Sequence, residues 1–163
     1  MTEARDLADV PNGISVNSSG LVTNSALPHF FVHKTATQTG SSGDVVSWQS
    51  VIRNNGSHWD GTNHRFTAPV NGVYMFTLTW LSVDGSNFED CSIYVDGVGI
   101  HHSRTPNRSG VASSNHMTNN IALSYYLTAS QLVDVRLATF SSGSSGIYGD
   151  SNMWTTFSGY LVG

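Results

Sequence analysis

Hydrophobic and polar residues alternate over the stretch that follows Asn71-Gly72. Every second residue there is large and apolar: Tyr74, Phe76, Leu78 and Trp80. Side chains two apart share one face of a strand, so one face of this segment is apolar and the other is mixed. Such a strand lies in a sheet that covers a core. We expect Asn71-Gly72 to form a tight hairpin turn with the strand before it, because Gly takes positive φ without steric cost.

Further short strands follow one another along the chain, with Gly, Ser, Asn and Asp between them. Alternation recurs from Ile121 to Leu127 and from Val133 to Leu137, and the chain ends on an extended segment, Trp154 to Val162. About ten short strands with turn residues between them and no helical period are typical of a β-sandwich. The pattern therefore predicts an all-β domain.

Residues 1–27 differ from the remainder of the chain. They contain short apolar pieces, such as Ile14–Val16 and Leu21–Thr23, that cannot bury themselves within one chain. We predict a stalk or linker over residues 1–27 and one folded domain over residues 28–163. The start of the chain lacks the apolar segment of a signal peptide, and no window of about 18 apolar residues predicts membrane insertion.

Charge is sparse in this protein. Only 11% of the residues are charged, the formal net charge is −4, and the seven basic residues form no cluster. A nucleic-acid partner needs a basic surface and is therefore not expected. The single cysteine, Cys91, alternates with Ile93 and Val95, which favours a small buried hydrophobic residue over a reactive or intermolecular thiol.

Several segments resemble a known family. The run FTAPVNGVYMF at residues 66–76 is similar to the signature of the globular head of complement component one q (C1q) and its relatives, the tumour-necrosis-factor-like jelly rolls. Ile93–Gly97 and Thr156–Leu161 resemble two later strands of that family. Residues Leu127–Val133 depart from it, because Ser130-Gln131 stands where the family usually has Gly-Asp.

The resemblance implies a homotrimeric jelly-roll sandwich. Seven apolar residues are expected in the core or at the trimer axis: Phe76, Leu78, Trp80, Ile93, Val135, Phe157 and Leu161. Relatives of this family often bind calcium, and oxygen ligands on irregular loops suit that ion. Three acidic residues are the candidate ligands: Asp84, Glu89 and Asp90. The alternative is a solvated acidic loop that binds nothing.

The opening residues, TEARDLADV, are similar to short leaders of bacteriophage tail fibres, and uncharged polar loops are common in virion proteins. We therefore expect a virion protein, made in the host cytoplasm, whose C-terminal head binds a host-surface glycan or protein receptor and whose other partners are tail or capsid proteins. The alternatives are a structural trimerisation or capsid-decoration protein and a non-phage C1q-like binding module. No nucleophile elbow, His-Glu-x-x-His or paired-cysteine motif is present, so no enzyme is expected.

Recognition by a sandwich falls on its loops. The loop from Ser103 to Asn120 carries Arg104, Arg108 and His116, and arginine pairs with carboxylates and phosphates. Residues 141–154 carry Tyr148 and Trp154, whose rings are suited to stacking on sugars. The alternative is that both loops are solvated and bind nothing. Trp59 lies beside turn residues, where it either stacks on a sugar or closes one end of the sandwich.

Overall fold

The computed structural model describes residues 14–16, 18–20, 22–24, 26–83, 89–105, 116–140 and 146–162. Over these residues the chain consists of strands and connections, with no helix long and apolar enough to cross a membrane. The strands are β1 (Ile14–Val16), β2 (Val22–Asn24), β3 (His29–His33), β4 (Gln38–Thr39), β5 (Ser50–Asn55), β6 (Trp59–Asp60), β7 (Arg65–Thr67), β8 (Gly72–Leu81), β9 (Glu89–Val95), β10 (Val98–Arg104), β11 (Thr118–Leu127), β12 (Leu132–Phe140), β13 (Gly146–Ile147) and β14 (Thr156–Leu161).

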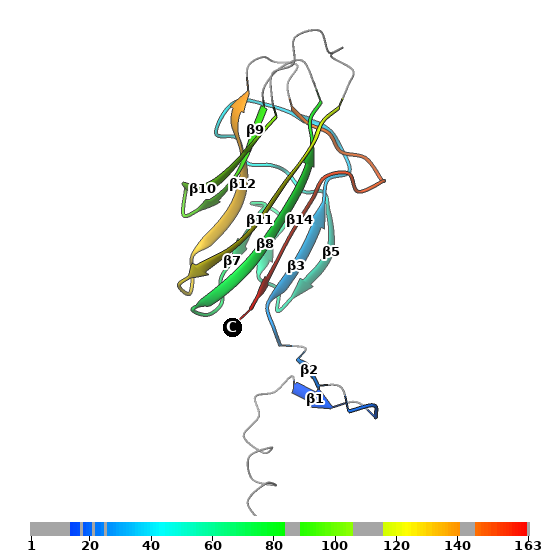
Figure 1. The fold of residues 1–163 in the computed structure, drawn as a ribbon, viewed down its shortest axis with the longest axis vertical. Helices are drawn as coiled ribbons and strands as arrows, with labels where there is room; N and C mark the ends of the chain where they lie inside the picture. Colours follow the sequence, from blue (N-terminus) through cyan, green and yellow to red (C-terminus); the bar gives the residue numbers. More distant parts are fainter. Residues whose placement is uncertain are drawn as a thin grey trace, which may run out of the picture.

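Two antiparallel five-stranded sheets form a sandwich (Figure 1). The β8 sheet has the order β11-β8-β14-β3-β5, and the β9 sheet has the order β10-β9-β12-β7-β6. Short pairs, β1 with β2 and β13 with β4, lie outside these sheets. Strands adjacent in space are mostly distant in sequence, as in a jelly roll. The predicted all-β jelly-roll fold is confirmed.

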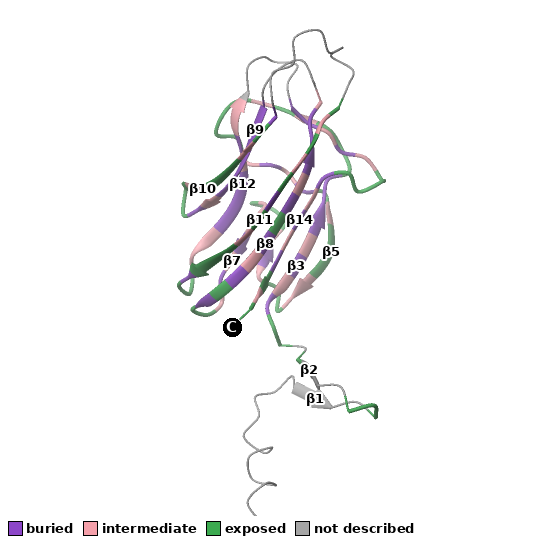
Figure 2. Ribbon diagram, viewed as in Figure 1, coloured by how far each residue is buried: buried purple, intermediate pink, exposed green. Residues whose placement is uncertain are grey.

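The core lies between the two sheets, where buried residues line both inner faces (Figure 2). Six of the seven residues predicted for the interior are fully buried, and Leu161 is partly buried against them. Residues between the apolar positions of β8, such as Val73 and Thr77, are exposed, so the alternation predicted the facing of this strand correctly. Cys91 is fully buried, and burial raises the pKa of its thiol, as expected for a small hydrophobic residue.

Aromatic rings dominate the packing near the middle of the β8 sheet. The Phe30 ring lies 5.0 Å from the Phe157 ring and 6.4 Å from the Phe76 ring, measured between centroids. Gly159 on β14 lies between β3 and β8, and a Cβ atom there would come within 2.6 Å of both the Phe30 and Phe76 side chains. The glycine is therefore required for space, and its absent side chain lets the two rings approach.

The hairpin predicted at Asn71-Gly72 is wrong. Strand β7 belongs to the β9 sheet and β8 to the other sheet, so the connection crosses between the layers. Neither Asn71 nor Gly72 is among the residues with positive φ. The connection is instead held by the β11–β12 turn, because Asn71 Oδ1 accepts a hydrogen bond from the Ala129 N–H at 2.7 Å. Turn residues mark a change of direction, but they do not show whether the next strand pairs with the previous one.

The departure from the family at Leu127–Val133 leaves the turn intact. Ser130 takes the glycine's place with a φ of 73°, in the left-handed region, and donates its N–H to the Ala68 carbonyl at 2.7 Å. Gln131 Nε2 donates to Asp96 Oδ2 at 3.0 Å. Side-chain and backbone hydrogen bonds therefore hold a serine in a conformation that glycine adopts without strain.

One lysine is enclosed in the sandwich. Lys34 is fully buried, and its Nζ donates to Gln38 Oε1 at 3.0 Å, the Ser47 carbonyl at 2.9 Å and Ser47 Oγ at 3.1 Å. Neither of the ion pairs found among the described residues involves it. Burial lowers the pKa of Lys34 from 10.5 to about 8, against a smaller opposing effect of Cys91. Within the described residues, the charged amine is thus hydrogen-bonded by neutral oxygen atoms.

Replacing Gly159 with Ala should overpack the core, because the added methyl group has no free space beside Phe30 and Phe76. We expect the free energy of unfolding to fall by about 1–3 kcal/mol in denaturant titrations. Ser158→Ala is the matched control, since Ser158 points to the outer face of the same strand. Equal stability of the two variants would contradict this account of the packing.

Stability should depend on the charge of Lys34. Its pKa is lower in the folded state than in the unfolded state, so the unfolded chain holds more protons between pH 8 and 10.5. We expect the free energy of unfolding of the wild type to rise over this interval relative to Lys34→Met, by up to about 3 kcal/mol. Below pH 8 the difference should be constant. Parallel pH profiles of the two proteins would show that burial does not disfavour the charged amine.

Candidate functional site

A pocket of about 310 Å³ opens where β8 ends and β14 begins, and it brings together three of the predicted ligand-binding residues. Its lining consists of Leu81, His116, Tyr148 and Trp154. They come from the last residue of β8 and from the residues beside the ends of β11, β13 and β14. We call it the aromatic pocket.

Backbone pairing explains why these distant residues meet. The Tyr148 N–H donates to the Leu81 carbonyl at 2.8 Å, which ties the segment after β13 to the end of β8. Thr155 is fully buried, and its Oγ1 donates to the Tyr148 carbonyl at 2.7 Å and accepts from the Leu81 N–H at 3.2 Å. Hydrogen bonds of the backbone therefore fix the position of Tyr148 in the pocket.

His116 has a fixed hydrogen-bonding role in the pocket. Its Nδ1 lies 2.7 Å from the Ser82 carbonyl oxygen, which can only accept, so Nδ1 carries the proton and donates. Its ring lies 4.7 Å from the Tyr148 ring, between centroids. In the neutral imidazole this leaves Nε2 as an acceptor.

Asp150 places a negative charge beside the rings. Its Oδ1 accepts from the Asn152 N–H at 2.7 Å, while Oδ2 accepts from Asn152 Nδ2 at 2.9 Å and from the Tyr148 hydroxyl at 3.2 Å. Burial opposes ionisation, but the hydrogen bonds from Asn152, Tyr148 and Trp154 together lower the pKa of Asp150. The charge of Asp150, and then its hydrogen bond, raises the pKa of Tyr148. At neutral pH the pair is a carboxylate and a protonated phenol.

Trp154 is exposed in this setting. The residue is 51% exposed, and the preceding residue, Met153, has a φ of 60°, which is unfavourable for a residue with a side chain. Left-handed non-glycine residues are uncommon and occur in turns as well as at functional sites. The local backbone therefore presents an aromatic ring to solvent rather than to the core.

Arg104, predicted on the same loop as His116, is not in the pocket. Arg104 lies on β10 of the other sheet, where its Nε and Nη2 donate to the two carboxylate oxygens of Asp90 at 2.7 and 2.6 Å. Arg108 lies outside the described residues. The predicted loop therefore contributes His116 to the aromatic pocket, while Arg104 is engaged elsewhere.

Trp59 closes the sandwich and does not present a face to a ligand. It is 4% exposed, and its ring stacks on Phe30 with 4.8 Å between centroids. Its backbone N–H donates to Asn54 Oδ1, and its backbone carbonyl accepts from Asn54 Nδ2. Of the two interpretations offered for Trp59, closure of one end of the sandwich is correct and stacking on a sugar is wrong. An aromatic residue beside turns can also point inward.

Two of the acidic residues proposed as calcium ligands, Glu89 and Asp90, form hydrogen bonds with different partners. Glu89 is fully buried and accepts a hydrogen bond from the Gly146 N–H at 3.0 Å, whereas both oxygens of Asp90 accept from Arg104. Successive strand residues point to opposite faces, so these two do not converge on one ion. No group of three His, Cys, Asp or Glu side chains suited to a metal occurs within the described residues. Asp84 lies outside them, so calcium binding stays a prediction.

Three contributors to the site were not predicted from the sequence. Asp150 and Asn152 form a local turn in which an Asp side chain bonds two residues ahead, and the spacing Asp-x-Asn is a usable signal for it. Leu81 continues the apolar run of β8, and nothing in that run marks its position at a pocket.

The sandwich and its strand order are those of the C1q and tumour-necrosis-factor jelly rolls. The globular domain of a zebrafish complement 1qA protein superposes with a TM-score of 0.64 at 15% identity, covering 83% of this chain and 98% of the other. The Eiger TNF of S. frugiperda gives a TM-score of 0.67 at 9% identity, covering 85% and 94%. These likenesses describe the fold.

The C1q domain profile matches residues 29–162, and the chain belongs to the C1q domain family. Complement C1q tumor necrosis factor-related protein 3 of Mus musculus is 27% identical over 137 residues, which is 81% of this chain and 50% of the relative. Complement C1q and tumor necrosis factor-related protein 9B of Homo sapiens is 28% identical over 134 residues, 82% of this chain and 38% of the relative. This chain thus spans half or less of these relatives.

Proposed function

We propose that this domain is a glycan-recognition module in which the aromatic pocket holds one sugar of a cell-surface glycan. The observation that carries the proposal is an exposed indole, Trp154, beside the ionised Asp150 and the acceptor nitrogen of His116. An indole packs against the C–H face of a pyranose, while carboxylate and imidazole acceptors bind its hydroxyl groups. Apolar walls with a few placed polar groups are the usual composition of a ligand site.

The same pocket supports binding without turnover. Glycoside hydrolysis uses a pair of carboxyl groups that flank the scissile bond. Among the described residues that line the pocket or bond to them, Asp150 is the one acidic side chain. C1q-like domains are in general non-enzymatic binding or structural modules.

The setting that we favour is the C-terminal head of a bacteriophage tail fibre or knob, with the glycan on the host surface. The similarity of residues 2–10 to tail-fibre leaders and the sparsely charged surface support it. A purely structural trimerisation or decoration role is the second candidate, since one fold carries many functions. Binding of any glycan by the aromatic pocket separates the two.

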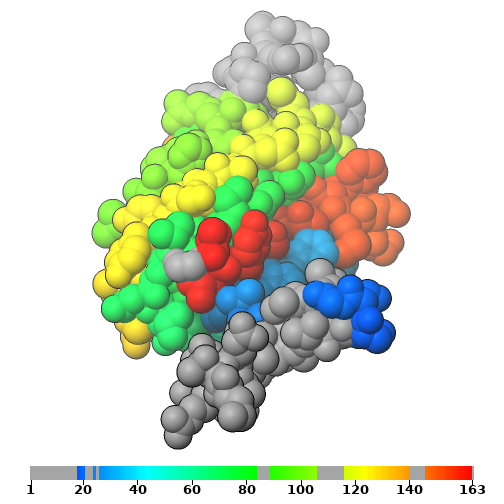
Figure 3. All heavy atoms as spheres, turned by 60° about the horizontal axis from the view of Figure 1, so that its bottom comes forward, coloured from blue at the N-terminus to red at the C-terminus, as the bar shows by residue number. Residues whose placement is uncertain are grey.

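Trimeric assembly is typical of C1q-like and TNF-like domains, and one face of this domain is suited to it. The outer face of the β8 sheet, which Figure 3 shows as adjacent bands of β11, β8, β14 and β3, exposes apolar side chains. Tyr126 is 58% exposed and lies opposite Val73, and Tyr160 is 49% exposed and lies opposite Met75.

The outer face of the β9 sheet is charged by comparison. It carries the ion pairs Arg104–Asp90 and Arg136–Asp134, and Arg136 also lies over the Tyr94 ring at 4.8 Å. Charged pairs favour contact with water, and exposed apolar rings favour contact with protein. We therefore assign the β8 face to the contacts between copies.

Removing the indole should weaken sugar binding. We expect Trp154→Ala to lose glycan-array signal and to raise the dissociation constant of any glycan that binds at least about fivefold, because stacking is lost. Trp154→Phe should recover part of the affinity. The control is Val98→Ala, which truncates a side chain that is 67% exposed on the other sheet. Unchanged binding by Trp154→Ala would remove the aromatic pocket from the proposal.

A charge on the β8 face should disrupt the trimer. We expect light scattering to give a trimer mass for the wild type and a monomer mass for Tyr160→Arg, because a guanidinium is costly to bury between apolar surfaces. Val98→Arg adds the same charge on the β9 sheet and should remain trimeric. A monomeric wild type at micromolar concentration would contradict the assembly, and a trimeric Tyr160→Arg would contradict the assigned face.

A further inference from the structure

The polar groups of the aromatic pocket accept hydrogen bonds, but their own protons are already engaged. The Tyr148 hydroxyl donates to Asp150 Oδ2 at 3.2 Å, and His116 Nδ1 donates to the Ser82 carbonyl at 2.7 Å. What these side chains offer to a ligand is the Asp150 carboxylate and, in the neutral imidazole, the acceptor nitrogen Nε2 of His116. A ligand group that only donates hydrogen bonds therefore suits the pocket better than one that must also accept them.

The negative charge beside the pocket is not balanced by a cation within the described structure. None of the four lining residues is Lys or Arg. Neither of the ion pairs in the described part of the chain involves Asp150. The groups that donate to its carboxylate at 2.7–3.2 Å, from Asn152 and Tyr148, are neutral. The carboxylate thus keeps its full charge beside the aromatic rings.

Two aromatic faces adjoin this carboxylate. The ring of Tyr148 is joined to Asp150 through its hydroxyl group, and the exposed Trp154 lines the same pocket. The faces of indole and phenol rings attract cations, and the indole does so most strongly. Donation of the phenol proton to a carboxylate polarises the ring and strengthens this attraction. A cation in the pocket would therefore be stabilised by ring faces and by a nearby negative charge together.

We propose that the aromatic pocket selects an ammonium group of the glycan, either the protonated amine of an amino sugar or a choline substituent. This inference rests on the glycan function proposed above and names the chemical class of the sugar. A protonated amine donates hydrogen bonds and accepts none, and a trimethylammonium group packs against aromatic faces. The selected charge is opposite to the one that Arg104 was expected to bind.

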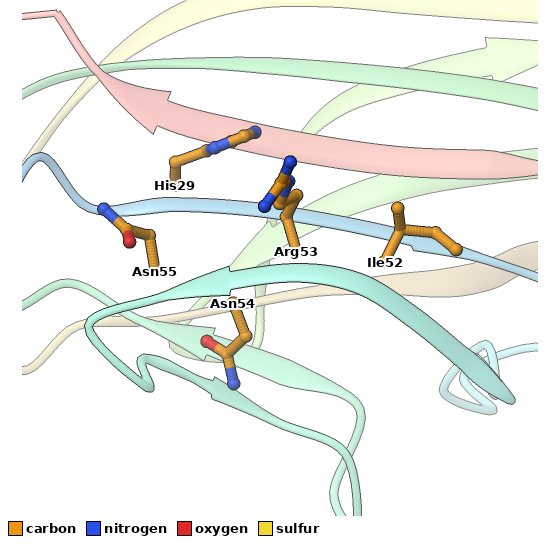
Figure 4. Close-up of a pocket in the computed structure, with 5 residues that line it drawn as sticks. All are labelled: His29, Ile52, Arg53, Asn54 and Asn55. Carbon is orange, nitrogen blue, oxygen red and sulfur yellow. The ribbon is translucent and has the colours of Figure 1, made fainter. Parts of the chain in front are cut away.

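The position of the pocket is compatible with the trimer that we propose. A second pocket, of about 480 Å³, is lined by His29, Ile52, Arg53, Asn54 and Asn55 (Figure 4). His29 lies beside Tyr160 on the face assigned to contacts between copies, so neighbouring subunits would cover that pocket. Leu81 is at the other end of β8, and the remaining lining residues of the aromatic pocket lie in connections outside the paired strands. Of these two pockets, we therefore assign the ligand to the aromatic one.

The test is a titration of the full chain at neutral pH and constant ionic strength, followed by NMR shifts and calorimetry. The probes are glucosamine, its neutral counterparts N-acetylglucosamine and glucose, and choline. We expect the wild type to bind glucosamine or choline at least about fivefold more tightly than either neutral sugar. Asp150→Asn should remove this preference, because the amide keeps the local turn but not the charge. Trp154→Ala should weaken all binding.

Asp60→Asn is the matched control. Asp60 forms a similar local turn on β6 of the other sheet, where its Oδ1 accepts from the backbone N–H groups of Thr62 at 2.8 Å and Asn63 at 3.1 Å. The same change of charge at this distant turn should leave the preference for the ammonium group as it is in the wild type. Unfolding in denaturant checks that Asp150→Asn is folded.

The outcomes separate this inference from the glycan function. Neutral sugars that bind as tightly as glucosamine, with a loss in Trp154→Ala, would overturn the selectivity and leave the glycan function standing. Binding of choline alone, dependent on Asp150 and Trp154, would support the ammonium site and contradict a sugar ligand.

An unchanged preference in Asp150→Asn would overturn the inference, as would a wild type that binds none of the probes. Light scattering on Trp154→Ala provides a further check. Loss of the trimer in this variant, with no probe bound by the wild type, would make Trp154 an intersubunit residue and refute the site.

Discussion

The close approach of Phe30 and Phe76 over Gly159 is the constraint on which the rest of the structure depends. A side chain at position 159 would meet both rings at 2.6 Å, so the middle of the β8 sheet closes only around a glycine. Once β14 is seated there, its two ends are fixed: Thr156 beside Thr79 and Tyr160 beside Met75. One packing event thus positions both ends of β14, including the segment that leads into the aromatic pocket.

The two ends of the β8 sheet differ in structure. At one end, buried Thr155 ties Tyr148 to Leu81, and a local turn holds Asp150 ionised beside exposed rings. At the other end, β3 pairs with β5 with a register shift between Phe31 and Val32, and the exposed Tyr160 lies beside His29. A rigid sheet therefore supports a binding surface at one end without any change in its core.

Strand facing was predictable from the sequence, and connectivity was less so. Alternation places Phe76 and Trp80 inside because period two is a property of every strand. The Asn71-Gly72 signal was assigned to a hairpin because a tight turn and a crossover between sheets use the same residues. His116 and Tyr148 were predicted as binding residues one loop at a time, yet their contact depends on long-range pairing that no local pattern records. The buried Lys34 was not anticipated, since lysine is rarely enclosed without a partner charge.

Assembly would strengthen binding by a pocket as small as the aromatic pocket. The aromatic pocket offers one exposed indole and a few acceptors, and contacts of this kind support weak binding to a single sugar. In the trimer that we propose, each pocket occurs three times on a rigid body, and the second and third contacts to a repetitive surface become intramolecular. Effective concentrations in the millimolar range then multiply modest affinities by two or more orders of magnitude. Recognition of a repetitive glycan would then depend on the spacing of its sugars as well as on the identity of one sugar.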